Sequence, residues 1–187
     1  MYLIFLDIDG VLNRGFDPSR VTRVDVGGLF AGGSRSNTNA GFDYHVESCV
    51  AALNTLIATT RAKIVISSSW RTEHPYEELC GILHERFEVV GEIIGQTPDV
   101  IEFPACRAAE IRAFLDQFEP DVEGVVILDD QDIFLDINNE RHQDPELEAR
   151  FVRTVTKVGL TTELAQNAAR LLLGGSGQSS ASTCALS

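Results

Sequence analysis

The stretch YLIFLDIDG, residues 2 to 10, decides the fold of this chain because an apolar run ends in two carboxylates one residue apart. A short apolar run of this kind is typical of a strand buried on both faces of a parallel sheet. Residues two apart on a strand point the same way, so Asp7 and Asp9 can reach one small volume. Such a pair suggests a metal-ligand set, a nucleophile, or both.

Outward from this strand, short β-branched runs alternate with longer helical patterns, which is typical of an α/β domain with a parallel sheet. Strands are predicted at 2–6, 63–66, 89–94 (closed by a turn at 95–98), 125–128 and, more weakly, 151–158. Helices are predicted at 46–60, 76–86, 107–118 and 160–173, the last with Thr161 or Thr162 as its N-cap.

The chain is predicted to form one domain over residues 1–173, followed by a disordered Gly- and Ser-rich tail at 174–187. The Gly- and Arg-rich segment at about 14–45 lacks the apolar periodicity of a helical cap. We expect a loop or small flap there, and its arginines either face solvent or recruit an anionic substrate.

The 187 residues carry a net charge of −13, from 15 basic and 28 acidic side chains. This balance argues against broad attraction to nucleic acid or anionic membranes, although it leaves room for a local basic site. No apolar run approaches the roughly 20 residues of a membrane span. The four cysteines form no CxxC pair and no signal-peptide pattern opens the chain, so we expect reduced thiols and a cytoplasmic location.

Polar side chains follow three of the predicted strands, where open parallel sheets bind their ligands. They are Asp7 and Asp9, then Ser67, Ser68 and Ser69, then Asp129 and Asp130. Clustered carboxylates repel one another unless a cation lies among them, and oxygen ligands favour Mg²⁺. An aspartate can attack phosphorus and a second acid can move the protons, so phosphoryl transfer is the expected reaction.

Three segments resemble motifs of the haloacid dehalogenase-like (HAD) phosphohydrolase superfamily: FLDIDGVLN at 5–13, KIVISSSWR at 63–71 and VVILDDQD at 125–132. The resemblance implies that Asp7 is the nucleophile, Asp9 the general acid and base, and Ser67 a phosphate ligand. It further implies that Mg²⁺ is held by Asp7, Asp129, Asp130 and the main-chain carbonyl of Asp9. Ser68 is a second phosphate-binding candidate, for which helix capping is the favoured interpretation.

The basic residue of the family's third motif has three candidates. Arg107 is favoured because it opens the helix that precedes the acidic pair, and an Arg can clamp a phosphoryl group bidentately. Arg71 and Lys63 remain open. Trp70 is interpreted as a packing residue, with stacking on a nucleic-acid base as the alternative.

These motifs, together with a GQTP turn and a late GLT, are similar to the HAD domain of multidomain RNA-repair proteins. The resemblance implies a Rossmann-like three-layer α/β/α core with a minimal cap and a Mg²⁺-dependent phosphomonoesterase that forms an aspartyl-phosphate. RNA or DNA end phosphates are one expected substrate class. The alternatives are a phosphatase of small metabolites or phosphoproteins and a non-catalytic phosphate-binding module. A receiver domain is disfavoured because its acceptor Asp follows a later strand.

Overall fold

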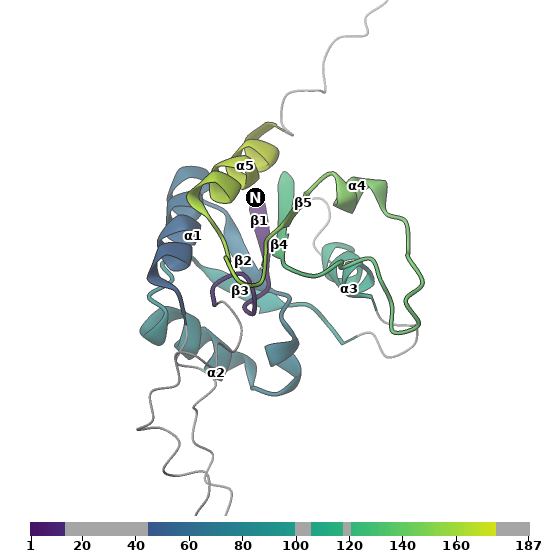
Figure 1. The fold of residues 1–187 in the computed structure, drawn as a ribbon, viewed down its shortest axis with the longest axis horizontal. Coiled ribbons are helices and arrows are strands. Elements are labelled where there is room, and N and C mark those ends of the chain that lie inside the picture. The colour runs from purple at the N-terminus through teal and green to yellow at the C-terminus, as the bar shows by residue number, and fades with distance from the viewer. Residues whose placement is uncertain (14–44, 100–105, 118–120, 175–187) are drawn as a thin grey trace, which may run out of the picture.

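The computed structural model describes residues 1–13, 45–99, 106–117 and 121–174, and its centre is a five-stranded sheet (Figure 1). The strand order is β3-β2-β1-β4-β5 and all four neighbouring pairs run parallel. The predicted α/β fold with a parallel central sheet is confirmed. The strands are β1 (Tyr2–Leu6), β2 (Lys63–Ile66), β3 (Ile93–Gln96), β4 (Gly124–Asp129) and β5 (Phe151–Arg153).

Helices cover both faces of the sheet, which completes the predicted three layers (Figure 1). The helices α1 (Glu47–Thr60) and α5 (Thr162–Gly174) share one core with α2 (Tyr76–Gly81) and the π-helical turn Ile82–Arg86 that continues it. On the other face lie α3 (Arg107–Leu115) and the short α4 (Pro145–Glu148). Thr161 caps α5, because its hydroxyl accepts the N–H of Leu164.

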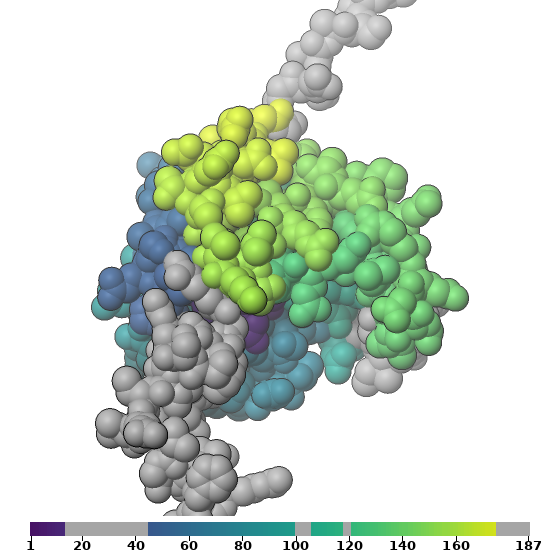
Figure 2. Space-filling model, in the orientation of Figure 1, coloured from purple at the N-terminus to yellow at the C-terminus, as the bar shows by residue number. Residues whose placement is uncertain are grey.

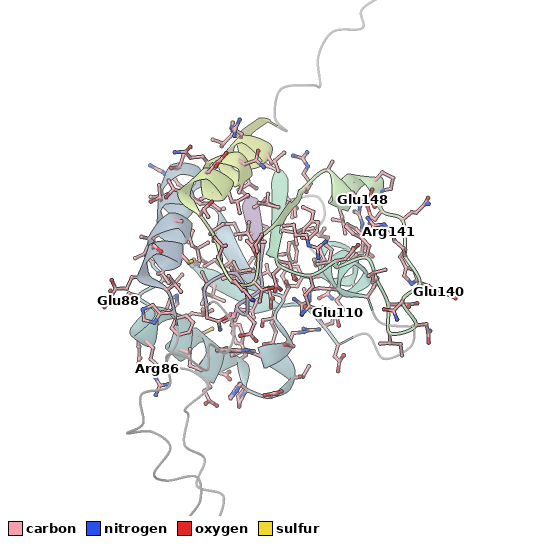
Figure 3. The ribbon with its side chains drawn as sticks, viewed as in Figure 1. Arg86, Glu88, Glu110, Glu140, Arg141 and Glu148 are labelled. Atoms are coloured by element: carbon pink, nitrogen blue, oxygen red, sulfur yellow. The ribbon has the colours of Figure 1, made fainter. Side chains whose placement is uncertain are left out.

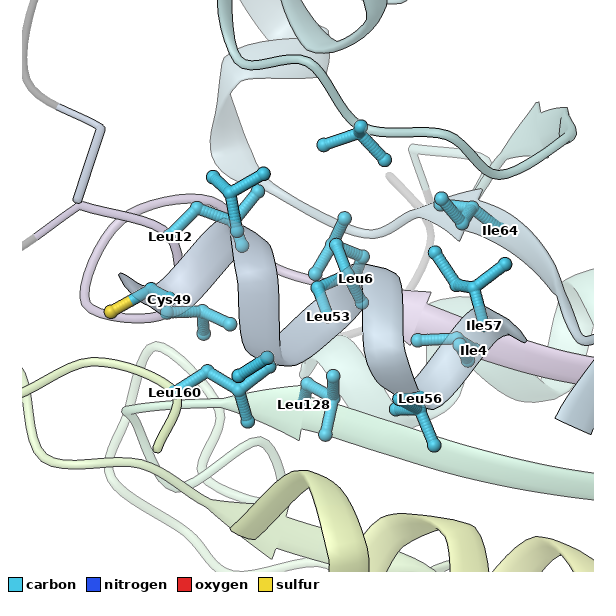
Figure 4. Packing of buried hydrophobic residues seen from close by; sticks show 14 of the residues in the cluster. Ile4, Leu6, Leu12, Cys49, Leu53, Leu56, Ile57, Ile64, Leu128 and Leu160 are labelled. Atoms are coloured by element: carbon cyan, nitrogen blue, oxygen red, sulfur yellow. The ribbon is translucent and has the colours of Figure 1, made fainter. Parts of the chain in front are cut away.

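Side chains of β1 alternate between these two cores, as a strand with period two requires. Ile4 and Leu6 pack with Leu53 of α1 (Figure 4). Phe5 points the other way and meets Phe114 of α3 edge to face, with ring centroids 5.6 Å apart. The N-terminal residues are almost covered by later segments on the face shown in Figure 2. The buried strand β1 therefore fixes the position of the residues that follow it, beginning with Asp7.

The predicted bounds of β3, residues 89–94, were wrong. Val89 belongs to the end of the preceding helical turn, because its N–H donates to the Leu83 carbonyl while Glu88 adopts a positive φ of 58°. Val90 bonds to the side chain of Asn54 instead of a strand. The strand consequently begins at Ile93 and takes in the first half of the predicted turn, ending at Gln96.

β5 is shorter than predicted because the chain turns away after Arg153. The Thr154 hydroxyl donates to the Gly10 carbonyl at 2.8 Å, and Leu160 N–H donates to the Val11 carbonyl at 2.8 Å. Residues 155–159 form a tight turn between these two anchors. The segment predicted as a strand end therefore closes over the loop that follows β1.

Several sequence predictions fall outside the described residues: most of the flap, the tail after residue 174, and Cys184. Cys49, Cys80 and Cys106 are free cysteines. Within the described ranges, no helix combines the length and apolarity needed to cross a bilayer.

Candidate active site

Three carboxylates meet at the carboxyl edge of the sheet, where β1 and β4 lie side by side. Asp7 follows β1 and anchors its own N–H on the Leu128 carbonyl at 3.0 Å, while Asp129 ends β4. Oxygen atoms from Asp7, Asp129 and Asp130 lie within 4.8 Å of one another. Asp7 is 3% exposed and Asp129 is fully buried, so neither charge is screened by water.

Burial and mutual repulsion act on the protonation of this cluster. Burial of the Asp7 carboxyl, and next the charge of Asp129, raise the pKa of Asp7 to about 7. Burial likewise raises the pKa of Asp129 above its usual range. A cation among the three acids would reverse both effects, so the cluster has the chemistry of a cation site.

Arg107, the first residue of α3, supplies a positive charge from the opposite side of the cluster. Its Nη1 lies 2.5 Å from Asp129 Oδ2 and 3.1 Å from Asp7 Oδ1. Both oxygens of Asp129 accept a hydrogen bond, because Oδ1 accepts the N–H of Gln131 at 2.8 Å. The two acids raise the pKa of the Arg107 guanidinium further, so it stays charged at any working pH.

Among the described residues, the buried atoms without a hydrogen-bond partner include Asp7 Oδ1, Asp130 Oδ1 and Ser67 Oγ, which follow β1, β4 and β2. The 3.1 Å contact from Arg107 to Asp7 Oδ1 is thus an ion pair without hydrogen-bond geometry. Unsatisfied buried polar atoms are costly, and in a native fold each is explained by a bound ion, an ordered water, strain or a catalytic role. Two carboxylate oxygens that accept no hydrogen bond, beside a third acid, fit a hard divalent cation such as Mg²⁺.

The segment Ser67–Arg71 after β2, here called the strap, contacts Asp9 through Trp70 and Glu110 of α3 through Arg71. Ser68 donates a hydrogen bond to the Asp7 carboxylate and accepts the Trp70 N–H at 3.4 Å, so it does cap the 3₁₀ turn Ser69–Thr72. Arg71 binds the Ser68 carbonyl at 2.8 Å and forms an ion pair of 2.5 Å with Glu110. The strap thus links the strand that ends at Ser67 to α3.

The ion pair between Arg71 and Glu110 is nearly dry, since the two side chains are 6% and 8% exposed. Figure 3 labels Glu110 on α3, on the side that faces the centre of the molecule. Burial raises the pKa of Glu110, and the nearby Arg71 opposes that shift. Both residues line a pocket of about 270 Å³ that also includes Arg107 and Asp129. The site therefore continues from the carboxylates into a polar cavity.

Asp9 lies beside the cluster, and both of its carboxylate oxygens accept hydrogen bonds. Asn13 Nδ2 donates to Oδ1 and Trp70 Nε1 donates to Oδ2, each at 2.7 Å. The interpretation of Trp70 as a packing residue was incomplete, because its ring packs on the core while its N–H reaches Asp9. No spacing in the sequence joins residues 61 positions apart, so only the fold reveals this pair.

The structure explains why a glycine, Gly10, follows Asp9. Its φ is +72°, and a Cβ at this position would overlap the carboxyl group of Asp130. Asp130 is also held in place by the Thr156 hydroxyl, which donates to its Oδ2 at 2.5 Å. The turn after β1 can therefore approach Asp130 this closely only if residue 10 has no side chain.

The three candidates for the basic residue have different surroundings. Lys63 begins β2, at the opposite edge of the sheet, where it pairs with Glu92 at 3.0 Å. Arg71 is engaged with Glu110, whereas Arg107 contacts the predicted nucleophile directly. Ser67 is buried at the carboxyl edge, as expected for a strand end. The roles assigned to all these residues remain predictions.

The strand order and the acids that follow β1 and β4 define a HAD-type domain of the hydrolase class. The family model described as the HAD domain in Swiss Army Knife RNA repair proteins matches residues 3–165, and the chain belongs to this family. The resemblance inferred from the three motifs is confirmed. Searches of curated proteins and of solved structures gave no match.

Proposed function

We propose that this domain is a Mg²⁺-dependent phosphomonoesterase in which Asp7 is the nucleophile. The observation that carries the proposal is that Asp7 Oδ1 is buried and accepts no hydrogen bond, and lies 3.1 Å from the Arg107 guanidinium in a cluster with Asp129 and Asp130. A nucleophilic oxygen must have a lone pair accessible to the phosphorus atom and must be held in a fixed place. Asp7 is held in place by the hydrogen bond from its N–H to the Leu128 carbonyl and by the ion pair of its Oδ1 with Arg107.

In the first step, Asp7 Oδ1 attacks phosphorus, and the bond from phosphorus to the leaving oxygen breaks. Asp9 gives its proton to that oxygen, so an alcohol departs and an aspartyl-phosphate remains. Asp9 then takes a proton from water, which attacks phosphorus and breaks the bond to Asp7. Inorganic phosphate leaves, and both acids return to their starting states.

Ser67 Oγ and the Arg107 guanidinium are the groups that we assign to the phosphoryl oxygens. Ser67 Oγ is buried and lacks a partner, so a phosphoryl oxygen would satisfy it. Arg107 already spans the nucleophile and Asp129 with one nitrogen, which leaves its other donors for a bidentate contact.

Asp7, Asp129, Asp130 and the Asp9 carbonyl would hold Mg²⁺. When bound, the ion offsets the repulsion between the carboxylates and an incoming phosphate. It would also lower the pKa of Asp7, which keeps the nucleophile ionised at neutral pH.

We assign the substrate to the end phosphates of RNA or DNA, on the strength of the family description alone. The net charge of −13 argues against broad electrostatic attraction to the nucleic-acid backbone, so we expect few phosphate contacts beyond the reacting end and a small salt dependence. Small phosphometabolites and phosphopeptides are the alternatives that a substrate panel must compare.

The test is phosphate release from p-nitrophenyl phosphate with Mg²⁺ or EDTA, by wild type, Asp7→Asn and the control Asp116→Asn, which changes an exposed acid at the end of α3. We expect Mg²⁺-dependent release by wild type and the control, and a loss of at least about 10³-fold in Asp7→Asn. Equal rates in wild type and Asp7→Asn would refute the nucleophile assignment. Oligonucleotide ends cleaved no better than sugar phosphates would refute the substrate assignment.

A further inference from the structure

The Asp9 carboxylate is oriented by two donors that come from different parts of the chain. Asn13 follows it on the turn after β1, and Trp70 belongs to the strap after β2. Among the described residues, these are the hydrogen bonds found to the Asp9 side chain. An ionised carboxylate has about four lone-pair sites, so one site on each oxygen remains for proton transfer.

Both donors are themselves fixed. Asn13 is 5% exposed, and its own oxygen accepts the Gly10 N–H at 3.1 Å. The Trp70 ring lies against Phe87, with centroids 6.4 Å apart at 67°, and its main chain is held by Ser68. A side chain fixed by packing can hold its partner more precisely than a mobile surface residue can.

We propose that Trp70 is a positioning residue that acts through Asp9, so that the indole N–H aims the Asp9 proton at the leaving oxygen. The proposal rests on the proposed function, because it assigns Trp70 a role in the proton transfer of that reaction. Without the N–H, the Asp9 carboxyl keeps one donor and can rotate about its Cβ–Cγ bond. Misalignment of this kind slows proton transfer without removing the acid.

The strap thereby links the binding of the phosphoryl group to the positioning of the acid. Ser67, at its start, is the group assigned to the phosphoryl oxygens, and Trp70, three residues on, holds the acid. Ser68 binds the nucleophile between them. Alignment of all three groups depends on one five-residue segment, which explains how a short motif can serve nucleophile, phosphate and acid together.

The contact itself can be tested without any assay of activity. Trp70 is the sole tryptophan of the chain, so a ¹⁵N-indole-labelled protein gives a single cross-peak for the N–H in question. We expect this peak to move upfield and to exchange faster with water in Asp9→Asn, and to stay in place in Asp116→Asn. An indole peak that is the same in wild type and Asp9→Asn overturns the proposal, whatever the activity of the protein.

The role in catalysis is tested with two esters that differ in leaving group. p-Nitrophenolate departs with little help from an acid, whereas an alkoxide such as that of glycerol phosphate needs a proton. With Mg²⁺ present, Trp70→Phe should lower kcat/KM for the alkyl ester about tenfold more than for the aryl ester. Tyr76→Phe is the matched control, because it removes a ring hydrogen bond to the Ile93 carbonyl nearby. It should not change the ratio.

An equal loss on both esters overturns the positioning role and leaves the proposed function intact. A wild type that hydrolyses neither ester refutes the proposed function and this role with it. If Trp70→Phe does not fold, replacement of the single tryptophan by benzothienylalanine keeps the bicyclic shape and removes only the N–H. The same ratio decides the outcome.

Discussion

Asp7→Asn is predicted to make the metal-free protein more stable while abolishing its activity. The Asp7 carboxyl is 3% exposed and lies beside Asp129, so its charge is unfavourable in the absence of a metal. Asparagine has nearly the same shape and carries no charge. A group arranged for reaction is thus expected to cost stability, as active-site groups often do.

The magnitude follows from the pKa of Asp7, which is raised from 3.8 to about 7. The folded state therefore binds more protons than the unfolded state between these values. Stability from this group is fully present below pH 3.8 and is lost as the pH rises toward 7. Three pH units correspond to about 4 kcal/mol. We expect Asn to recover about 2–4 kcal/mol at pH 8, because Asp7 and Asp129 share the cost.

The assay is urea unfolding in EDTA at pH 5, 6, 7 and 8, for wild type and Asp7→Asn. The gain at pH 8 should raise the urea midpoint by about 1–2 M and should shrink toward pH 5. Saturating Mg²⁺, at about 100 times its Kd, should stabilise wild type by about 2.7 kcal/mol and Asp7→Asn far less.

Asp144→Asn is the control, because it should change the stability at pH 8 in the opposite direction. The pKa of Asp144 is lowered, chiefly by its hydrogen bonds with Arg112, and asparagine can still cap α4. This variant should be destabilised at pH 8, by less than about 1 kcal/mol because the pair is partly exposed. The reasoning about Asp7 is refuted if Asp7→Asn is less stable than wild type in EDTA at pH 8, or if its advantage does not depend on pH.

Three further predictions concern the neighbouring contacts. Glu110→Ala leaves the Arg71 guanidinium buried without its partner, so urea unfolding should show a loss of about 3–5 kcal/mol, while Glu146→Ala, at an exposed ion pair, should change stability by about 0.5 kcal/mol or less. Gly10→Ala should weaken Mg²⁺ binding in calorimetric titrations at least about tenfold, because the new methyl group displaces Asp130; an unchanged Kd would contradict this. Arg107→Lys keeps the charge but loses the fork, so kcat/KM should fall about 10–100-fold, and wild-type kinetics would show that a point charge suffices.

The sequence predicted best those features that the backbone alone determines. β1 and β2 were predicted to the residue, because a buried apolar run followed by polar groups has two sharp limits. The rule that ligands bind at the carboxyl edge then selected Asp7, Ser67 and Asp129, and the fold brings these side chains to that edge. β3 was misplaced because Val89 and Val90 have strand-like side chains, yet their N–H groups are used by a helix end and by Asn54. Hydrophobic patterns do not reveal where a backbone hydrogen bond goes.

Partnerships between side chains were the part that sequence reasoning could not supply. Arg71 and Trp70 are neighbours in a motif, yet one binds Glu110 on α3 and the other binds Asp9 on the loop after β1. Both partners were unpredictable, since they depend on which distant segments of the fold lie next to the 3₁₀ turn Ser69–Thr72. The basic residue of the third motif was ambiguous for the same reason. Arg71 and Arg107 both reach the pocket, but each is committed to a different acid. The Arg71–Glu110 ion pair fixes the strap on α3, and Arg107 is the cation that lies beside Asp7, the proposed nucleophile.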